Sequence, residues 1–306
     1  MNEHSLSPDR PDVPNLVVAS GITPFYFSST RGRLVTLGPL ANVLIQRHNY
    51  PYSISILGGE ALALVAALAS ALKFQGSFSL QIKGEGALSL LVADCTEKGE
   101  LRFYARFDEE KLSSLPHHAT ALQLLQKGLF ALTVDQKNDK KTYQGMVEIK
   151  GNSLSEMATH YFETSEQYPC WIRLVCQYHD HEWRASALIL EKIAVDATPS
   201  PLPEKDKEEE WNTALILAQT VTEKELLEKK LNSQELILHL FGSMSPKIAK
   251  ARPVSYGCRC SRSRLMTVLQ SFSEADLNSM SVKGNITVTC EFCHYDFVFN
   301  RKDPHA

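Results

Sequence analysis

Four of the seven cysteines stand in two close pairs, and they restrict the possible folds of this chain more than any other feature. Cys258 and Cys260 form a C-x-C pair, Cys290 and Cys293 form a C-x-x-C pair, and 29 residues separate the two. When a fold brings two such turns together, the four sulfurs can occupy the corners of a tetrahedron around zinc. A terminal segment of fewer than 50 residues cannot easily bury a sufficient core without such a staple. We therefore predict one zinc ion on four thiolates, structural or redox-active because no coordination position is left for a substrate.

The composition is that of a globular protein with more than one unit. The chain has 306 residues, of which 43% are hydrophobic and 22% charged. A net charge of −3 argues against a surface built as a whole for nucleic acid. The first residues, MNEHSLSPDRPDVPNL, lack the pattern of a secretory signal and read as a flexible tail on a cytoplasmic protein. In a reducing compartment, paired cysteines are more often metal ligands or redox groups than structural disulfides.

One apolar segment, Ile54 to Leu72, approaches the length of a membrane span. It contains Glu60 and many alanines, glycines and serines, and no second apolar run accompanies it. We expect a core helix that packs tightly inside the protein, with a membrane anchor as the alternative.

Strand patterns and a few helices fill residues 22–195 and predict an α+β domain with a mixed sheet. The segments FSLQIKG, LSLLVAD and LRFYARF alternate as an antiparallel meander. FALTVDQ and TYQGMVEIKG flank a KNDK turn, and CWIRLVCQYHD with HEWRASALIL reads as another hairpin. Ser153 and Glu156 have the spacing of a capping box that opens a short helix.

This domain shows no convincing active site, so we do not expect an enzyme. KGEG is a hairpin turn rather than a phosphate loop, because it lacks a third glycine and a following helix. His179, Asp180 and His181 crowd one turn and are a weak alternative metal site, since their spacing is not one that metal sites use. Three further cysteines lie on apolar strands, where a thiol behaves as a small hydrophobic group: Cys95, Cys170 and Cys176.

Residues 196–257 read as a charged hinge followed by a helical linker. The hinge DATPSPLPEKDKEEE is rich in proline and charge. Beyond it, Trp211, Leu215, Ala218 and Val221 have helical spacing, and Thr222 with Glu225 forms a second capping box. These helices have one apolar side each, so we expect them to dock on the first domain, on the terminal unit, or on both, with marginal stability.

The terminal unit, residues 258–306, is predicted to contain a helix over Ser261–Phe272, a second helix after Ser273, and a hairpin whose turn holds CEFC. Six basic residues without an intervening acid surround its start: Lys247, Lys250, Arg252, Arg259, Arg262 and Arg264. They permit two interpretations. They can bind nucleic acid, or they can offset the negative charge of a zinc tetrathiolate.

Several segments resemble the redox-regulated 33 kDa heat-shock chaperonin family of bacteria, over nearly the whole chain. They are the cysteine spacing C-x-C-S-R…I-T-V-T-C-E-F-C together with RGRLVTLG (Arg31 to Gly38), GEALALVAALASALKFQG (Gly59 to Gly76), YQGMVEIKG (Tyr143 to Gly151) and HYFETSEQYP (His160 to Pro169). The resemblance implies that the reduced protein holds zinc and is inactive. It also implies that oxidation forms one disulfide within each pair, expels zinc, unfolds the linker and creates an ATP-independent holdase.

The resemblance assigns roles to residues of this chain. It makes Cys258, Cys260, Cys290 and Cys293 the zinc ligands, with Cys258–Cys260 and Cys290–Cys293 as the disulfides. Residues 1–21 are then a tail, 22–195 a core domain for client binding and dimerisation, 196–257 the linker and 258–306 the redox switch.

Release of the linker would expose apolar side chains to unfolded client proteins: Trp211, Leu215, Leu226, Leu231 and Phe241. We expect a homodimer when oxidised, no membrane association, and no nucleic-acid partner. A zinc-containing nucleic-acid-binding protein is the alternative, and an enzyme with an unrecognised site is a third hypothesis. The chaperone hypothesis alone explains the linker helices and the thiol-rich terminus together.

Overall fold

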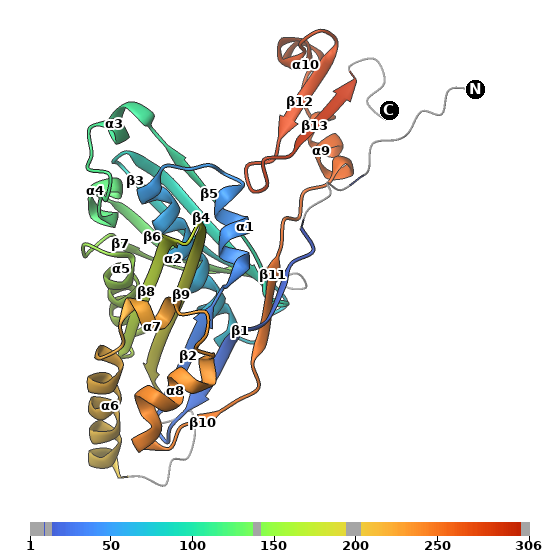
Figure 1. Ribbon diagram of the computed structural model, residues 1–306. Helices are drawn as coiled ribbons and strands as arrows, with labels where there is room; N and C mark the ends of the chain where they lie inside the picture. Colours follow the sequence, from blue (N-terminus) through green and yellow to red (C-terminus); the bar gives the residue numbers. More distant parts are fainter. Residues whose placement is uncertain (1–8, 10–13, 137–141, 194–202, 301–306) are drawn as a thin grey trace. The chain divides into compact units, whose positions relative to one another are not determined.

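The structure is a computed structural model that describes residues 9, 14–136, 142–193 and 203–300. The chain forms two compact units. One runs from Leu16 to Gly257, and the other starts at Cys258 and includes the described residues ahead of Leu16. The α+β fold class is confirmed by a large mixed sheet with helices and a separate cysteine-bearing unit (Figure 1).

The larger unit is built on an 11-stranded sheet with the order β7-β6-β3-β4-β5-β11-β1-β2-β9-β8, and β10 pairs with β1. All described pairs are antiparallel except β11 with β5. The strands are β1 (Val17–Tyr26), β2 (Thr30–Thr36), β3 (Gly76–Gly84), β4 (Leu88–Thr96), β5 (Glu100–Phe107), β6 (Gly128–Gln136), β7 (Thr142–Glu148), β8 (Cys170–His179), β9 (Glu182–Lys192), β10 (Lys247–Ile248) and β11 (Arg252–Tyr256).

The predicted meander is β3-β4-β5, and both predicted hairpins, β6-β7 and β8-β9, are present. The KNDK turn lies outside the described residues. The helices of this part are α1 (Pro39–Gln46), α2 (Tyr52–Ala71), α3 (Glu109–Ser113), α4 (Ala121–Leu125), α5 (Leu154–Tyr161) and the π-helix η1 (Phe162–Glu166). At α5, the Ser153 hydroxyl accepts a hydrogen bond from the backbone N–H of Glu156, as the capping pattern predicts.

Helix α2 is the core helix that the sequence predicts. It is long and apolar enough to cross a membrane, but 78% of its most apolar window is buried inside the protein. Two glycines let it approach the sheet, because a Cβ at Gly58 would lie 2.3 Å from Phe103 and one at Gly59 would lie 2.3 Å from Sγ of Cys176. The small residues therefore serve packing against β5 and β8.

The linker helices α6 (Glu204–Gln219), α7 (Glu223–Leu227) and α8 (Ser233–Phe241) lie on the face of β1, β2, β8 and β9 that is opposite to α2 (Figure 1). Trp211, Leu226 and Phe241 are buried in one cluster with Leu34 and Leu188. Thr222 and Glu225 complete a capping box at α7. Of the docking sites that the sequence allows, the helices thus use the first domain, and they do so through a sizeable apolar cluster.

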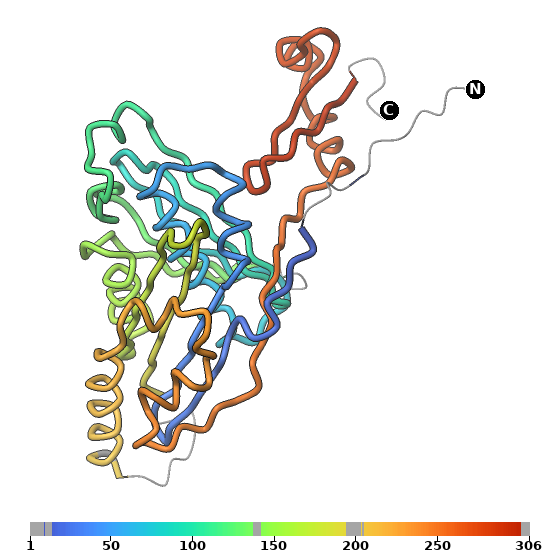
Figure 2. The backbone as a smooth tube through the Cα atoms, viewed as in Figure 1, coloured from blue at the N-terminus to red at the C-terminus, as the bar shows by residue number. Residues whose placement is uncertain are grey.

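Sequence patterns do not reveal β10 and β11, which follow the short 3-10 helix η2 (Gly242–Met244). Figure 2 traces this segment along β1. β11 lies between β1 and β5 and is the one strand that joins β5 to β1 within the described sheet. Pro253 sits where the β1 pairing is irregular, between Ile22 and Val18, so a missing N–H is tolerated in a central strand.

The smaller unit contains α9 (Arg262–Leu269), α10 (Glu274–Met280) and the hairpin β12 (Asn285–Thr289) and β13 (Asp296–Asn300), all as predicted. Five buried side chains make its core: Met266, Leu269, Ile286, Phe297 and Phe299. β1 begins at Val17, inside the segment expected to be a tail, and the linker shares its compact unit with the first domain. The four predicted segment boundaries stay a prediction.

Candidate metal centre

The two cysteine pairs are held by different local structures of the smaller unit. Cys258 and Cys260 precede α9, whose N-cap is Ser261, with the serine hydroxyl accepting from the N–H of Arg264. Cys290 and Cys293 lie in the turn between β12 and β13. The N–H groups of Cys293 and His294 both donate to the carbonyl oxygen of Cys290, and His294 has a positive φ of 51°. The second pair is therefore bent into a tight turn by its own hydrogen bonds, whereas the first is placed directly ahead of the capped start of α9.

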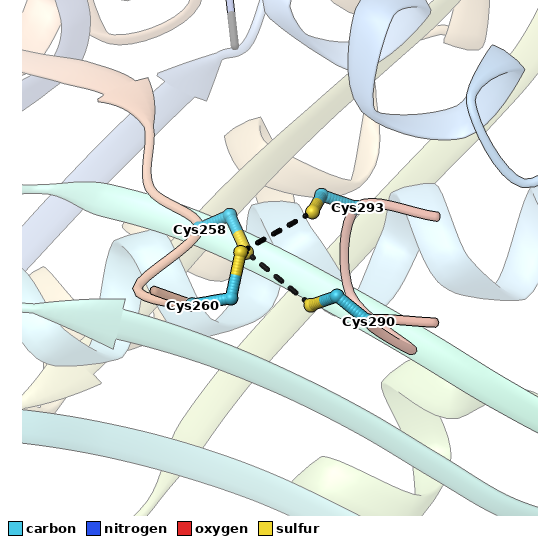
Figure 3. A group of neighbouring side chains, drawn as sticks. All are labelled: Cys258, Cys260, Cys290 and Cys293. Atoms are coloured by element: carbon cyan, nitrogen blue, oxygen red, sulfur yellow. Dashed lines mark hydrogen bonds between the residues drawn. The ribbon is translucent and has the colours of Figure 1, made fainter. Parts of the chain in front are cut away.

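The four sulfur atoms point toward one another (Figure 3). All lie within 4.8 Å of each other. Sγ of Cys258 is 3.4 Å from that of Cys260 and 3.6 Å from that of Cys290, and Sγ of Cys260 is 3.5 Å from that of Cys293. Among the described residues, these cysteines are the one group of three or more metal-ligating side chains so arranged.

This geometry fits zinc. Sulfurs held tetrahedrally at about 2.3 Å from zinc lie about 3.8 Å apart, close to the separations observed. Two ligands are buried and two are partly buried, so the site is closed around its sulfurs. The fold therefore brings together the ligand set that the spacing predicts, and the donor set of four sulfurs suits a soft or borderline cation.

The close approach of the sulfurs shifts the pKa values of the thiols in opposite directions. Hydrogen bonds from Cys290 and Cys293 lower the pKa of Cys258 far below the usual range of a thiol. Burial and the hydrogen bond to Cys258 raise the pKa of Cys260, and the bond to Cys258 raises that of Cys293. One thiolate is thus favoured at the expense of its neighbours. A divalent cation compensates the negative charge that forms when the other thiols also lose their protons. Metal binding and thiol deprotonation are therefore linked.

The other three cysteines are buried in the sheet unit, as expected. Burial, followed by Glu191, raises the pKa of Cys170 to about 12, and burial raises that of Cys176 well above its ordinary value. The thiols of Cys170 and Cys176 therefore stay protonated and unreactive at neutral pH.

The weak alternative site at His179–His181 is a hairpin turn between β8 and β9. Asp180 and His181 both have positive φ, of 51° and 62°, as a tight two-residue turn requires. The Asp180 carboxylate accepts from Arg184 at 3.0 Å and contacts His179 at 2.9 Å. These side chains are explained by the turn and its ion pairs.

The six basic residues do not form one continuous segment of structure. Lys247, Lys250 and Arg252 belong to the sheet unit, and the other three belong to the smaller unit. Several donate to carbonyl oxygens: Arg252 to Ser70, Arg262 to Val298 and Arg264 to Arg259.

The five side chains predicted to meet clients all lie in or against the linker cluster. Trp211, Leu226 and Phe241 are buried, and Leu215 and Leu231 are partly buried. Phe241 packs against Phe25 and Phe27, with ring centroids 5.3 and 5.6 Å apart. They are covered in this conformation, as the predicted inactive state requires.

A polar clamp that the sequence did not suggest also holds the linker. The Glu210 carboxylate of α6 accepts hydrogen bonds from the N–H groups of Ser28 and Ser29 at 2.9 and 2.7 Å, and from the Ser29 hydroxyl at 2.6 Å. About 180 residues separate these partners, so no local pattern could reveal them. The clamp fixes α6 to the β1–β2 turn.

Fold and site together define a two-unit protein that combines a large mixed sheet with a small module of four clustered cysteines. The family model described as Hsp33 protein matches residues 22–300, and the chain belongs to that family. A 33 kDa chaperonin of Caulobacter vibrioides is 34% identical over 271 residues, covering 86% of this chain and 88% of the relative. One of Ectopseudomonas mendocina is 32% identical over 285 residues, covering 91% and 92%.

A solved structure shares the fold. The crystal structure of the 33 kDa chaperonin of Thermotoga maritima, an HSP33 homologue, superimposes with a TM-score of 0.76. It covers 93% of this chain and 96% of its own, at 17% sequence identity. At that identity the similarity concerns the fold.

Proposed function

We propose that this protein is a redox-regulated, ATP-independent chaperone that holds unfolding proteins after its thiols have been oxidised. The observation that carries the proposal is the four-sulfur cluster built from two separate pairs, in a chain of the Hsp33 family. In the reduced state Cys258, Cys260, Cys290 and Cys293 hold one zinc ion, which supplies cross-links to a module with few buried side chains.

Oxidation uses the close approach within each pair. A thiolate attacks peroxide, breaking the O–O bond and becoming a sulfenic acid, and the hydroxide that leaves takes up a proton to give water. The neighbouring thiol then displaces the hydroxyl group, forming the disulfide Cys258–Cys260 or Cys290–Cys293 and a second water. Each disulfide consumes one peroxide and removes two metal ligands, so two disulfides leave the zinc ion without its site.

The path from the cysteines to the linker runs through β11. Tyr256, the last residue of β11, is two positions before Cys258. The strand is bound through few backbone pairs, Ser255 and Tyr256 to β5 and three residues to β1. Loss of the ordered cysteine turn frees one end of this strand. We propose that β11 and then the linker helices loosen, exposing Trp211, Leu215, Leu226, Leu231 and Phe241 together with the sheet face beneath them.

The partners in this proposal are unfolded or partly unfolded proteins, and the oxidised form is a homodimer in the cytoplasm. No enzymatic step is involved. The first domain supplies the surface on which clients and the second subunit bind.

A client-aggregation assay tests the proposal. Zinc-loaded reduced protein and peroxide-treated protein are each mixed with an unfolding client, and light scattering is followed without ATP. We expect only the oxidised sample to suppress scattering, and thiol reduction with zinc to reverse the effect. A Cys95→Ser variant serves as the matched thiol control and should switch normally. Equal suppression by reduced and oxidised protein, or none by either, would contradict the proposal.

A further inference from the structure

A second site lies in the sheet unit, where four of the quoted sequence motifs meet. A cavity of about 390 Å³ is lined by Arg31 of the first motif, the last turn of α2 from the second, Tyr143–Gly145 of the third and Tyr161–Tyr168 of the fourth. None of these segments takes part in the cysteine centre.

At its charged end the cavity is lined by the guanidinium of Arg31 and the carboxylate of Glu191, and the buried Arg33 bonds the same carboxylate without lining the cavity. Glu191 accepts from Nε of Arg31 at 2.7 Å, from Arg33, and from the Tyr168 hydroxyl at 3.1 Å. Arg33 and Glu191 are almost fully buried, whereas the Arg31 side chain is 37% exposed. Nε of Arg33 is buried without a hydrogen-bond partner. Arg31, Arg33 and Glu191 together carry one excess positive charge, and the partly exposed Arg31 is the member of this group that an anion in the cavity can reach.

The tyrosine in this group stays a neutral donor. Burial, followed by the nearby Glu191 carboxylate, raises the pKa of Tyr168 above its usual range. As a neutral hydroxyl, Tyr168 donates a hydrogen bond to Glu191 and brings no negative charge to Arg31 or Arg33.

The rest of the cavity is apolar. Leu132, Phe78 and Phe162 are buried in its wall, and Ala71 and Leu72 close the side formed by the end of α2. A cavity of several hundred Å³ with mostly apolar walls and a few convergent polar groups is typical of small-molecule sites. The apolar wall and the cationic end of the cavity are complementary to a ligand with an apolar body and an anionic head.

We propose that this cavity binds a small amphipathic carboxylate, with the carboxylate on the exposed guanidinium of Arg31 and the acyl or aryl body along Leu132 and Phe162. Of the five N–H groups of a guanidinium, Arg31 gives the one on Nε to Glu191, and a ligand carboxylate approaches from the exposed side. This inference is independent of the chaperone proposal, since it requires neither oxidation nor a client.

The mouth of the cavity holds an acid that sets the expected orientation. Glu166 is exposed and accepts a hydrogen bond from Tyr161 at 3.0 Å. Its charge opposes a carboxylate bound near the mouth, so the ligand head belongs at Arg31. Glu166→Gln should then tighten binding of an anionic ligand modestly, about twofold to threefold.

Titration of the reduced, zinc-loaded full-length protein with decanoate, below its micelle concentration, tests the site by calorimetry and by NMR. We expect one decanoate per chain. Arg31→Gln should weaken binding about tenfold or more, because a charge-assisted hydrogen bond is lost. Ala71→Phe, on the half-buried last turn of α2, should fill the cavity and abolish binding. Lys73→Gln, exposed and two residues along the chain, is the matched surface control and should bind as the parent does.

Two comparisons make the result decisive. Decanol has the same body without the charge and should bind at least tenfold more weakly. An acetylated tripeptide ending in phenylalanine, as free acid or as amide, distinguishes a polypeptide terminus from a free acid as the source of the carboxylate. Because Arg31→Gln can disturb Glu191, the Ala71→Phe and Glu166→Gln variants give readings that do not depend on it. Absence of binding by both acids, equal binding of decanol, or undiminished binding to Ala71→Phe would each overturn the proposal.

Discussion

The linker helices and the cysteine module are stabilised in different ways. The linker cluster contains 14 buried side chains shared between α6–α8 and the sheet, with Phe241 fully enclosed. The module has five buried side chains in its own core and relies on four sulfurs that converge on one point. Apolar burial does not respond to oxidants, whereas thiolates do.

Under the proposed function, this difference places the sensor and the concealed surface in separate parts of the chain. The part that oxidation can reach has little core to keep it folded, and the part that oxidation cannot reach holds the apolar surface. In the proposed function the change passes along the backbone from Cys258 into β11, whose last residue is Tyr256. The following variants change one side of this comparison at a time.

The largest effect is expected in the double variant Cys258→Ser, Cys290→Ser. Structural zinc contributes about 10 kcal/mol or more to the folding of such modules, so losing one ligand from each pair should unfold residues 258–300. The metal content and the NMR spectrum of the reduced protein report this directly. The sheet unit should keep its spectrum, and full zinc retention would refute the assignment of the ligands.

Phe241→Ala should loosen the linker without touching the cysteines. Removing a fully buried ring costs about 3–5 kcal/mol, and this ring packs on Phe25 and Phe27. We expect α8 to exchange its amide hydrogens faster and the reduced, zinc-loaded protein to hold clients without oxidant. Leu238→Ala, at an exposed position of the same helix, is the control and should stay inactive until oxidised. If the reduced Phe241→Ala protein is as inactive as the parent, loosening the linker is not sufficient for client binding.

Glu60 links the stability of the sheet unit to pH. Burial in α2, assisted by Glu223 and opposed by Arg173, raises its pKa from 4.5 to about 8. The folded protein therefore binds a proton that the unfolded chain releases, and stability falls as pH rises between these two values. Glu60→Gln should remove this part of the decline in urea unfolding, with Glu148→Gln as an exposed control. Parallel pH profiles for parent and Glu60→Gln would show that the carboxyl is ionised in the fold.

The smallest effect is expected for Cys170→Ser. Its thiol is buried and its pKa is raised to about 12, so hardly any thiolate is present to react with peroxide. Oxidant should activate this variant at the rate of the parent in the aggregation assay. Failure to activate would mean that a sheet cysteine belongs to the switch.

Sequence patterns predicted the parts of this molecule that depend on neighbours along the chain. The alternation in β3–β5, the capping box at Thr222 and Glu225, and the C-x-x-C turn are all local, and each is present. The spacing of the two cysteine pairs was enough to predict that their four sulfurs meet. In a module this short, few folds keep two such turns away from each other.

Features set by distant partners escaped prediction. β11 contains Pro253, a poor strand former, and it becomes a strand because β1 and β5 flank it. The Glu210 clamp and the cavity at Arg31 likewise depend on residues brought together by the sheet. Their components look like ordinary surface charges until the fold is known.

The most direct test of the account is hydrogen exchange on the reduced, zinc-loaded protein and on the oxidised, zinc-free protein. Oxidation is predicted to remove protection first from Val254–Tyr256 in β11 and then from Trp211–Phe241, while α2 stays protected. If oxidation releases zinc and the amides of β11 and the linker helices remain as protected as before, the proposed coupling between the cysteine centre and the linker is wrong.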